Sequence, residues 1–216
     1  MNYAAFKSGT DIRGFAADGF EKEALFMSDE FIKKTALAFV DLLCKKSGKK
    51  AEEIKISVGH DSRVSAPRIK NCLFEALTSK IAQVLDCSLA STPAMFMSVV
   101  KTDADAAIQI TASHHPWERN GLKFFTVSGG LEGEDISAIL SAAENEDISF
   151  LKPDSSKIKK IDFMSEYAAD LRGMIKKGVN AEDFEHPLKG YKIIVDAGNG
   201  VGGFYANNVL APLGAD

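Results

Sequence analysis

Residues 106–125 read AAIQITASHHPWERNGLKFF. In this stretch the short apolar runs AAIQI (106–110) and LKFF (122–125) flank a polar loop, and both runs have the length and composition of buried strands. A loop held between two buried strands is placed by a rigid frame, and functional side chains concentrate in such loops. The stretch therefore predicts a sheet with a functional loop at its edge.

Three side chains of this loop are candidates for chemistry. Ser113 could act as a nucleophile, because an exposed hydroxyl can carry a covalent intermediate when a base or a charged partner activates it. The alternative is a loop serine that bonds only to nearby backbone. His114 and His115 could transfer protons near neutral pH. Neighbouring residues of an extended segment point to opposite sides, so at most one of the two is expected to serve Ser113.

Two basic residues could assist a reacting group. Lys123 opens the return strand and could orient or deprotonate a hydroxyl, or it could simply be a solvated lysine on an edge strand. Arg13 lies in SGTDIRGF (8–15), where an arginine could grip an anion with its planar fork or pair locally with Asp11. Asp61 and Arg63 repeat this spacing, and for them a local ion pair that fixes the loop is preferred.

Helical and strand patterns alternate around this stretch. Ser28 predicts the start of a helix and Gly48 its end, with acidic residues in the first turn. Pro67 and the Thr92-Pro93 pair predict two further helix starts. The predicted helices are 28–48, 67–80, 92–100 and 135–144, and the predicted strands are 54–58, 81–87, 106–110 and 122–125.

This alternation predicts an α/β fold: a three-layer α/β/α sandwich with a mixed, mostly parallel sheet, followed by a partial second α/β domain. Right-handed crossovers bring the loops after parallel strands to one rim of the sheet. The loops GHDSR (59–63), ASTPA (90–94) and TASHHP (111–116) are therefore expected to share that rim.

A polar, Lys-rich link, KPDSSKIKK (152–160), is typical of a domain boundary. The elements predicted after it are a helix over 163–178, a strand over 191–197, a turn over 198–203 and a helix over 204–214. One strand and one helix do not make a domain core, so we expect a chain cut inside a larger protein. The expected parts are a first domain (1–152), a linker with a connecting helix (153–186) and the start of a second domain (187–216).

Composition limits the classes of function. The 216 residues carry a formal charge of −4 with acids and bases interleaved, so a nucleic-acid partner is not expected and a small-molecule role is favoured. Cys44, Cys72 and Cys87 lack CxxC spacing and lie beside apolar residues, which predicts reduced thiols rather than disulfides or a zinc site. No signal-peptide pattern and no apolar run of about 18 residues is present, so a membrane partner is not expected and a cytoplasmic location is.

Four motifs stand together in a recognisable order: GTDIRG (9–14), GHDSR (59–63), TASHHP with NGLKFF (111–125), and VDAGNGVGG (195–203). In order and approximate spacing they resemble the α-D-phosphohexomutase family, the phosphoglucomutases and phosphomannomutases. TASHHP followed by NGLK is the specific part of the resemblance, which covers essentially the whole chain. His115 departs from the asparagine that is more common in the family, and Trp117 and Glu118 replace small residues.

The resemblance implies an intramolecular phosphotransferase built from four domains around one cleft, of which this chain would be the first domain and the opening of the second. Ser113 would carry the phosphoryl group as a phosphoserine and exchange it with a hexose phosphate through a hexose bisphosphate, moving phosphate between C1 and C6. His114 matches the proton-transfer position and Lys123 the orienting position, and Arg13 matches an arginine near the phosphoserine. The remaining domains of the parent chain would be its partners.

The resemblance also implies Mg2+, held in the family by the phosphoserine and by the aspartates of a DGDGDR-like loop in the second domain. This sequence contains no such loop. Ser113 is therefore the only metal ligand expected here, and the other ligands are expected in the missing part of the second domain. One alternative follows directly, namely an excised domain that has no activity alone.

Two other classes of protein are alternatives. Gly198, Gly200 and Gly203 satisfy GxGxxG, which suggests a dinucleotide-binding module, although Asp216 precedes the strand whose end should carry the ribose-binding acid. A serine hydrolase is the second alternative, but GxSxG is absent and His114 is adjacent to Ser113 in sequence.

Overall fold

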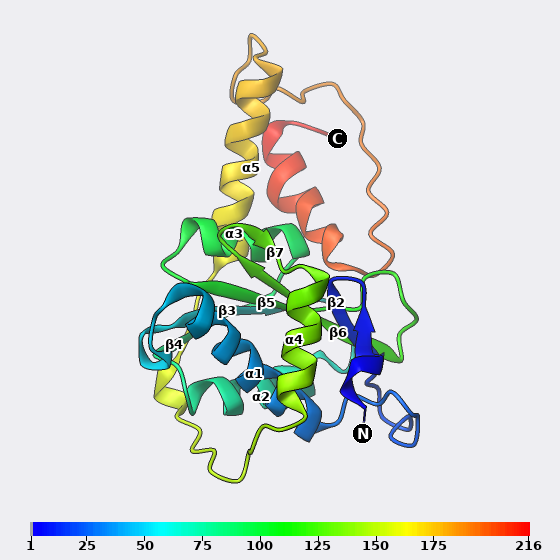
Figure 1. The fold of residues 1–216 in the computed structure, drawn as a ribbon. Helices are drawn as coiled ribbons and strands as arrows, with labels where there is room; N and C mark the ends of the chain where they lie inside the picture. The colour runs from blue at the N-terminus through cyan, green and yellow to red at the C-terminus, as the bar shows by residue number, and fades with distance from the viewer. Residues whose placement is uncertain (1) are drawn as a thin grey trace.

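An eight-stranded mixed sheet forms the centre of the computed structural model, which describes residues 2–216 (Figure 1). Its strand order is β1-β2-β6-β5-β3-β4-β8, and β7 pairs with β6. β5, β3, β4 and β8 pair in parallel, whereas β1, β2, β6 and β7 make antiparallel pairs. The strands are β1 Lys7–Ser8, β2 Asp11–Phe15, β3 Lys55–His60, β4 Gln83–Leu89, β5 Ala106–Ile110, β6 Arg119–Thr126, β7 Gly129–Gly130 and β8 Ile158–Lys160.

Helices cover both faces of this sheet, so the predicted α/β/α sandwich is confirmed (Figure 1). α1, α2 and α4 bury their apolar side chains against one face, and α3 and α5 pack on the other, where they form a separate apolar cluster. The helices are α1 Asp29–Ser47, α2 Ala66–Thr78, α3 Thr92–Lys101, α4 Gly133–Ala143 and α5 Phe163–Val179.

The helix ends follow the predicted signals. The Ser28 hydroxyl accepts a hydrogen bond from the Phe31 N–H at 3.2 Å and caps α1, as short polar side chains do at helix starts. Gly48 ends the helix in the left-handed conformation, with φ 72°, which glycine adopts without steric cost. Pro67 lies in the first turn of α2, where its missing N–H has no intrahelical role.

Four strands of the sheet were not predicted, namely β1, β2, β7 and β8. β2 lies inside SGTDIRGF (8–15). Its Gly14 is required by close packing, because a Cβ there would lie 2.4 Å from the Leu25 carbonyl oxygen. β8 lies inside the stretch interpreted as a polar link and pairs with β4 at the edge of the sheet. Its lysines, Lys159 and Lys160, are typical of edge strands and obscured the strand pattern.

Residues 191–197, predicted as a strand, form no strand, so this prediction is wrong. Ile193 N–H donates to Asp216 O at 2.8 Å and Asp216 N–H donates to Tyr191 O at 2.9 Å. Within residues 2–216 no strand lies beside the rest of the segment, which runs alone along one side of the molecule (orange in Figure 1). Ile194 is 89% exposed. A strand needs a neighbour to pair its backbone groups, whatever its propensity.

The C-terminal residues form the predicted helical region as a continuous run of short helical pieces over 201–213, among them Val201–Gly203, Ala206–Leu210 and Ala211–Leu213. Val209 and Leu213 pack with Ala168 of α5. Within residues 2–216 no strand leads directly into Gly198, so the strand, turn and helix that a dinucleotide site requires are not formed at this position.

Candidate active site

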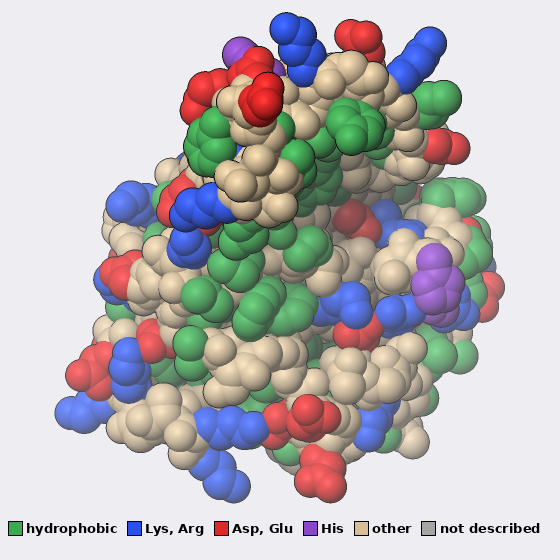
Figure 2. All heavy atoms as spheres, turned by 90° about the horizontal axis from the view of Figure 1, so that it is seen from above, with side chains coloured by type: hydrophobic (Ala, Val, Ile, Leu, Met, Phe, Trp, Pro, Cys, Tyr) green, Lys and Arg blue, Asp and Glu red, His purple; other side chains and the backbone are tan. Residues whose placement is uncertain are grey.

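The loops after β3, β4 and β5 meet at one rim of the sheet, as predicted. Asp61 N–H donates to Ile110 O at 3.0 Å, and Ala90 N–H donates to His60 O at 2.9 Å. A cavity of about 460 Å³ opens beside these loops, and it is also lined by residues 198–201. Figure 2 looks onto this side of the molecule and shows a hollow with acidic and basic side chains in it.

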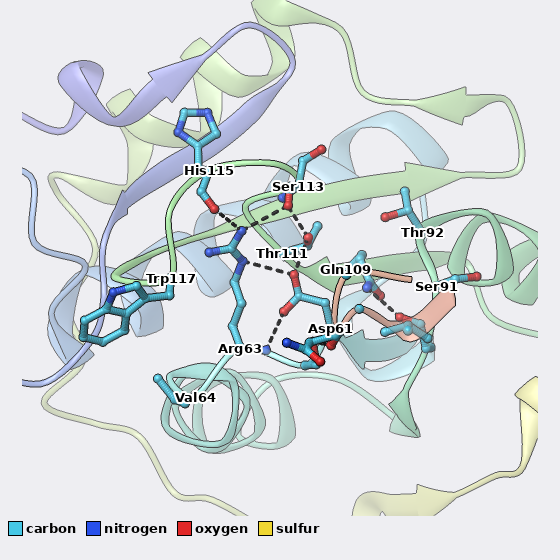
Figure 3. Close-up of a pocket in the computed structure, with 16 residues that line it drawn as sticks. Asp61, Arg63, Val64, Ser91, Thr92, Gln109, Thr111, Ser113, His115 and Trp117 are labelled. Atoms are coloured by element: carbon cyan, nitrogen blue, oxygen red, sulfur yellow. Dashed lines mark hydrogen bonds and ion pairs between the residues drawn. The ribbon is translucent and has the colours of Figure 1, made fainter. Parts of the chain in front are cut away.

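Ser113 lies exposed on the loop between β5 and β6 and lines this cavity. Its φ is 59°, a left-handed conformation that costs a residue with a Cβ about 1–2 kcal/mol. Its N–H donates to the Thr111 hydroxyl at 2.9 Å. In Figure 3 its own hydroxyl points away from the Arg63 guanidinium. The serine thus has an unusual backbone conformation and an accessible oxygen, as a nucleophile requires.

Arg63 lies under the Ser113 loop and contacts its backbone (Figure 3). The predicted ion pair with Asp61 is present, with Nε 3.2 Å from Oδ2. Four further N–H groups of the guanidinium donate to main-chain carbonyls of the loop. These carbonyls belong to Ser113 (3.0 Å), His115 (2.6 Å), Pro116 (2.6 Å) and Arg119 (2.8 Å). The GHDSR motif therefore fixes a second loop as well as its own.

Asp61 connects this arginine to Thr111. The Thr111 hydroxyl donates to Asp61 Oδ2 at 2.6 Å and accepts the Ser113 N–H. A chain of polar contacts thus runs from Arg63 through Asp61 and Thr111 to the amide of Ser113. Sequence reasoning gave Thr111 no role, because a threonine before a loop has many ordinary uses.

Arg13 and Lys123 meet at one carboxylate. Arg13 Nη2 lies 2.7 Å and Lys123 Nζ 2.5 Å from Asp11 Oδ2. The Asp11 side chain is 8% exposed, so this oxygen is nearly buried beneath both cations. Arg13 Nε is also buried and has no partner within residues 2–216.

The register places these cations on the sheet face next to the Ser113 loop. Arg13 lies opposite Gly121, whose carbonyl accepts the Thr111 N–H at 3.0 Å, and Lys123 lies opposite Gln109. Alternate residues of a strand share one face, so Lys123, Arg13 and Thr111 lie on the same side. The sequence predicted the two cations but not the bridging role of Asp11.

The two histidines are stacked, with ring centroids 5.1 Å apart. His114 is exposed and His115 is half-buried. Burial lowers the pKa of His115, and the positive charges of Arg13, His114, Arg119 and Arg63 lower that pKa further. A neutral imidazole at position 115 is thus favoured near pH 7, and His114 is the more accessible ring.

The C-terminal segment reaches the same rim through two contacts. The Ser62 hydroxyl donates to Asn199 O at 2.9 Å, and the Ser91 hydroxyl lies 2.5 Å from the Tyr205 hydroxyl. Neither contact carries a sequence signal, because both depend on how residues far apart in the chain come together.

The described residues also bear on metals, thiols and membranes. Within residues 2–216 no group of three or more His, Cys, Asp or Glu side chains could hold a metal ion. All three cysteines are free thiols, and burial raises the pKa of Cys72 and Cys87 to about 12. In the same range, every helix is too short or too polar to cross a bilayer.

Residues 10–149 match the family described as phosphoglucomutase/phosphomannomutase, alpha/beta/alpha domain I. The chain belongs to this family. The match covers strands β2 to β7 of the sheet, together with the Ser113 loop and the cationic side chains around it.

Relatives of the phosphoglucomutase/phosphomannomutase family align along most of this chain. A phosphoglucosamine mutase of Nautilia profundicola is 31% identical over 206 residues, covering 94% of this chain and 44% of the relative. A phosphoglucomutase of Neisseria meningitidis serogroup B is 28% identical, covering 94% and 39%. A phosphomannomutase/phosphoglucomutase of Pseudomonas putida is 27% identical, covering 76% and 33%. The chain thus spans less than half the length of these relatives.

A crystal structure from Burkholderia thailandensis, titled as a phosphoglucomutase/phosphomannomutase family protein, has the same fold. Its TM-score is 0.74 at 22% identity, with 100% of this chain and 43% of the other chain covered. At this identity the likeness concerns the fold alone.

Proposed function

We propose that this chain is part of an enzyme that moves a phosphoryl group between C1 and C6 of a hexose phosphate. The observation that carries the proposal is the exposed Ser113 at the cavity. Its N–H is bonded to Thr111 and its C=O to Arg63, and its side-chain hydroxyl points away from Arg63. Its relatives are named as mutases of glucose, mannose and glucosamine phosphates.

In the proposed reaction Ser113 starts as a phosphoserine. Its phosphoryl group passes to the free hydroxyl of a hexose monophosphate, so the serine O–P bond breaks and a sugar O–P bond forms. The proton of the sugar hydroxyl leaves to a base, and the serine oxygen regains a proton. The resulting hexose bisphosphate turns over and returns its other phosphoryl group to Ser113, so the enzyme ends as it began.

We assign the proton transfers to His114, the exposed ring beside Ser113. Lys123 and Arg13 supply positive charge for the phosphoryl group on Ser113, since phosphoryl transfer depends mainly on positioning and charge neutralisation. Asp11 keeps both cations at fixed places through one shared oxygen. In this role Lys123 acts as a cation that orients the group.

Mg2+ is the proposed cofactor, and Ser113 is its proposed ligand in this chain. Phosphate oxygens suit Mg2+, which prefers a few carboxylates together with phosphates. The described residues offer no carboxylate cluster to complete the site, so the other ligands must come from elsewhere in the enzyme. When bound, the ion would neutralise phosphoryl charge.

We propose the domain boundaries expected from the sequence: a first domain over 1–152, a connecting segment over 153–186 and the start of a second domain over 187–216. The connecting segment supplies β8 to the sheet of the first domain and α5 to one of its faces. With its metal ligands and sugar-reading residues outside this chain, the 216-residue chain alone is expected to show negligible mutase turnover.

The test uses a protein that contains this chain together with the remaining length found in its relatives. Ser113→Ala is expected to abolish turnover of glucose 1-phosphate, mannose 1-phosphate or glucosamine 6-phosphate in the presence of Mg2+, because no oxygen remains to carry the phosphoryl group. Fragmentation mass spectrometry should locate the phosphoryl group on Ser113 in the unmodified enzyme.

The matched control is Ser128→Ala. Ser128 is also exposed, and its N–H likewise donates to the threonine two residues before it, Thr126, at 3.3 Å. This variant should retain normal rates. Normal turnover in Ser113→Ala, or phosphate mapped to another residue, would contradict the proposed function.

A further inference from the structure

The Arg63 guanidinium has no donor left for a substrate, although it lines the cavity. A guanidinium carries five N–H groups in a planar fork. In this structure Nε, both Nη1 hydrogens and both Nη2 hydrogens have acceptors, namely Asp61 and the four loop carbonyls. The side chain is 11% exposed. Its chemistry is therefore directed at the loop rather than at a ligand.

The carbonyl acceptors of Arg63 are spread along the loop from Ser113 to the start of β6. The first belongs to Ser113 itself and the last to Arg119, the first residue of β6. The N–H of Ser113 is held by Thr111 and its C=O by Arg63. With both polar groups of one residue bonded, its φ of 59° is imposed by its surroundings, which is how unfavourable backbone conformations persist at functional sites.

We propose that Arg63 is the positioning residue of Ser113: it holds the serine in the left-handed conformation that presents its hydroxyl to the cavity. The inference rests on the proposed function for its chemical meaning, but the conformation itself can be measured without any reaction. A lysine at this position would keep the charge and lose the fork, because an ammonium has three donors on a flexible stem.

The first experiment compares Arg63→Lys with the wild-type 216-residue chain by NMR. Wild-type Ser113 should show the strong intraresidue amide–Hα NOE that a positive φ produces. Arg63→Lys should lose this NOE, and the exchange rates of the His115 and Arg119 amides should rise at least about tenfold as the loop opens. Retention of the NOE and of slow exchange in Arg63→Lys would overturn the proposal.

The matched control is Arg68→Lys. Arg68 also donates to two main-chain carbonyls, those of Ala16 (3.0 Å) and Met27 (3.1 Å), and to Asp29 at 2.5 Å. It is an arginine of similar chemistry that does not touch the Ser113 loop. This variant should keep the Ser113 NOE and slow loop exchange, and loss of both would show that the effect is not specific to Arg63.

A second measurement needs no substitution and covers the case in which Arg63→Lys does not fold. In the wild-type chain, five bonded N–H groups should hinder rotation about the Cζ–N bonds of Arg63, so that its Nη protons give separate, slowly exchanging signals. A single averaged signal for these protons would show that the five N–H groups of Arg63 are not held, and would overturn the proposal.

The functional arm uses the longer protein described above. There Arg63→Lys should lower kcat about 100-fold, the cost of a misplacement of about 1 Å, and leave KM unchanged, since no donor of Arg63 faces the substrate. A rise in KM with unchanged kcat would overturn the positioning role. If the unsubstituted protein shows no turnover, the proposed function fails. The NOE, the amide exchange and the Nη signals still test whether Arg63 holds Ser113 in the left-handed conformation.

Discussion

His115 illustrates how one side chain near the cavity is tuned by its neighbours. Burial and the nearby positive charges lower its pKa in the folded chain, whereas the unfolded chain should have the ordinary value of about 6.5. Between these two values the unfolded state binds more protons, so stability rises with pH. The contribution of a neutral His115 is thus complete above the unfolded value and is lost as the pH falls towards the folded one.

This predicts that acidification destabilises the wild-type chain more than it destabilises His115→Gln. The measurement is the thermal midpoint of both chains between pH 5 and pH 7.5, together with an NMR titration of His115, whose midpoint should lie below about 6.5. Equal acid sensitivity of the two chains, or a titration midpoint above that value, would contradict the assigned environment.

The candidate site was predictable to the extent that it depends on local sequence. The polar loop between two apolar runs indicated Ser113, and the flanking basic residues indicated Lys123. Arg63 was correctly expected to pair with Asp61, but its four carbonyl contacts join residues 50 to 56 positions apart. Every residue has a main-chain carbonyl, so the sequence does not indicate which carbonyls an arginine side chain will bind.

Strands and helices differed in how well their own residues specified them. α1 carries its start and stop signals in sequence, at Ser28 and Gly48. β8 does not, because three residues with two lysines become a strand only where β4 offers an unpaired edge. The segment 191–197 shows the reverse case, since its residues favour a strand but the described chain supplies no partner along most of it.

β2 contains a glycine, Gly14, at which any larger residue would displace neighbouring atoms. A Cβ at Gly14 would lie 2.4 Å from Leu25 O and 2.9 Å from side chains of Met27 and Phe6. Gly14→Ala is therefore expected to lower the free energy of unfolding by about 1–3 kcal/mol, the usual cost of overpacking. Urea unfolding followed by circular dichroism measures it.

Gly173→Ala is the matched control for this prediction. Gly173 lies inside α5, and apart from its chain neighbours and the nearby backbone of its own helix nothing lies within 4 Å of the position that its Cβ would take. Alanine is favoured over glycine in helices by about 1 kcal/mol, so this variant should be more stable than the wild type. A Gly14→Ala chain as stable as Gly173→Ala would refute the close packing of β2.

The loops after the parallel strands and the C-terminal segment meet at one rim of the sheet. The three loops at the carboxyl ends of β3, β4 and β5 meet there, and the turn at 198–201 docks on them through Ser62 and Asn199. The same side of the sheet carries the cations that meet at Asp11. Of the apolar clusters, Ala90 and Val201 line this cavity, and its other lining residues lie outside those clusters.

The solitary segment 191–197 has a consequence for handling the protein. Tyr191, Ile194 and Val195 are 61%, 89% and 41% exposed, and an unpaired apolar stretch of strand-forming residues is a template on which other copies can assemble. The 216-residue chain should therefore form concentration-dependent aggregates, detectable by light scattering. Ile194→Lys should suppress these aggregates without changing the thermal midpoint. Equal scattering from both chains would show that segment 191–197 does not cause the aggregation.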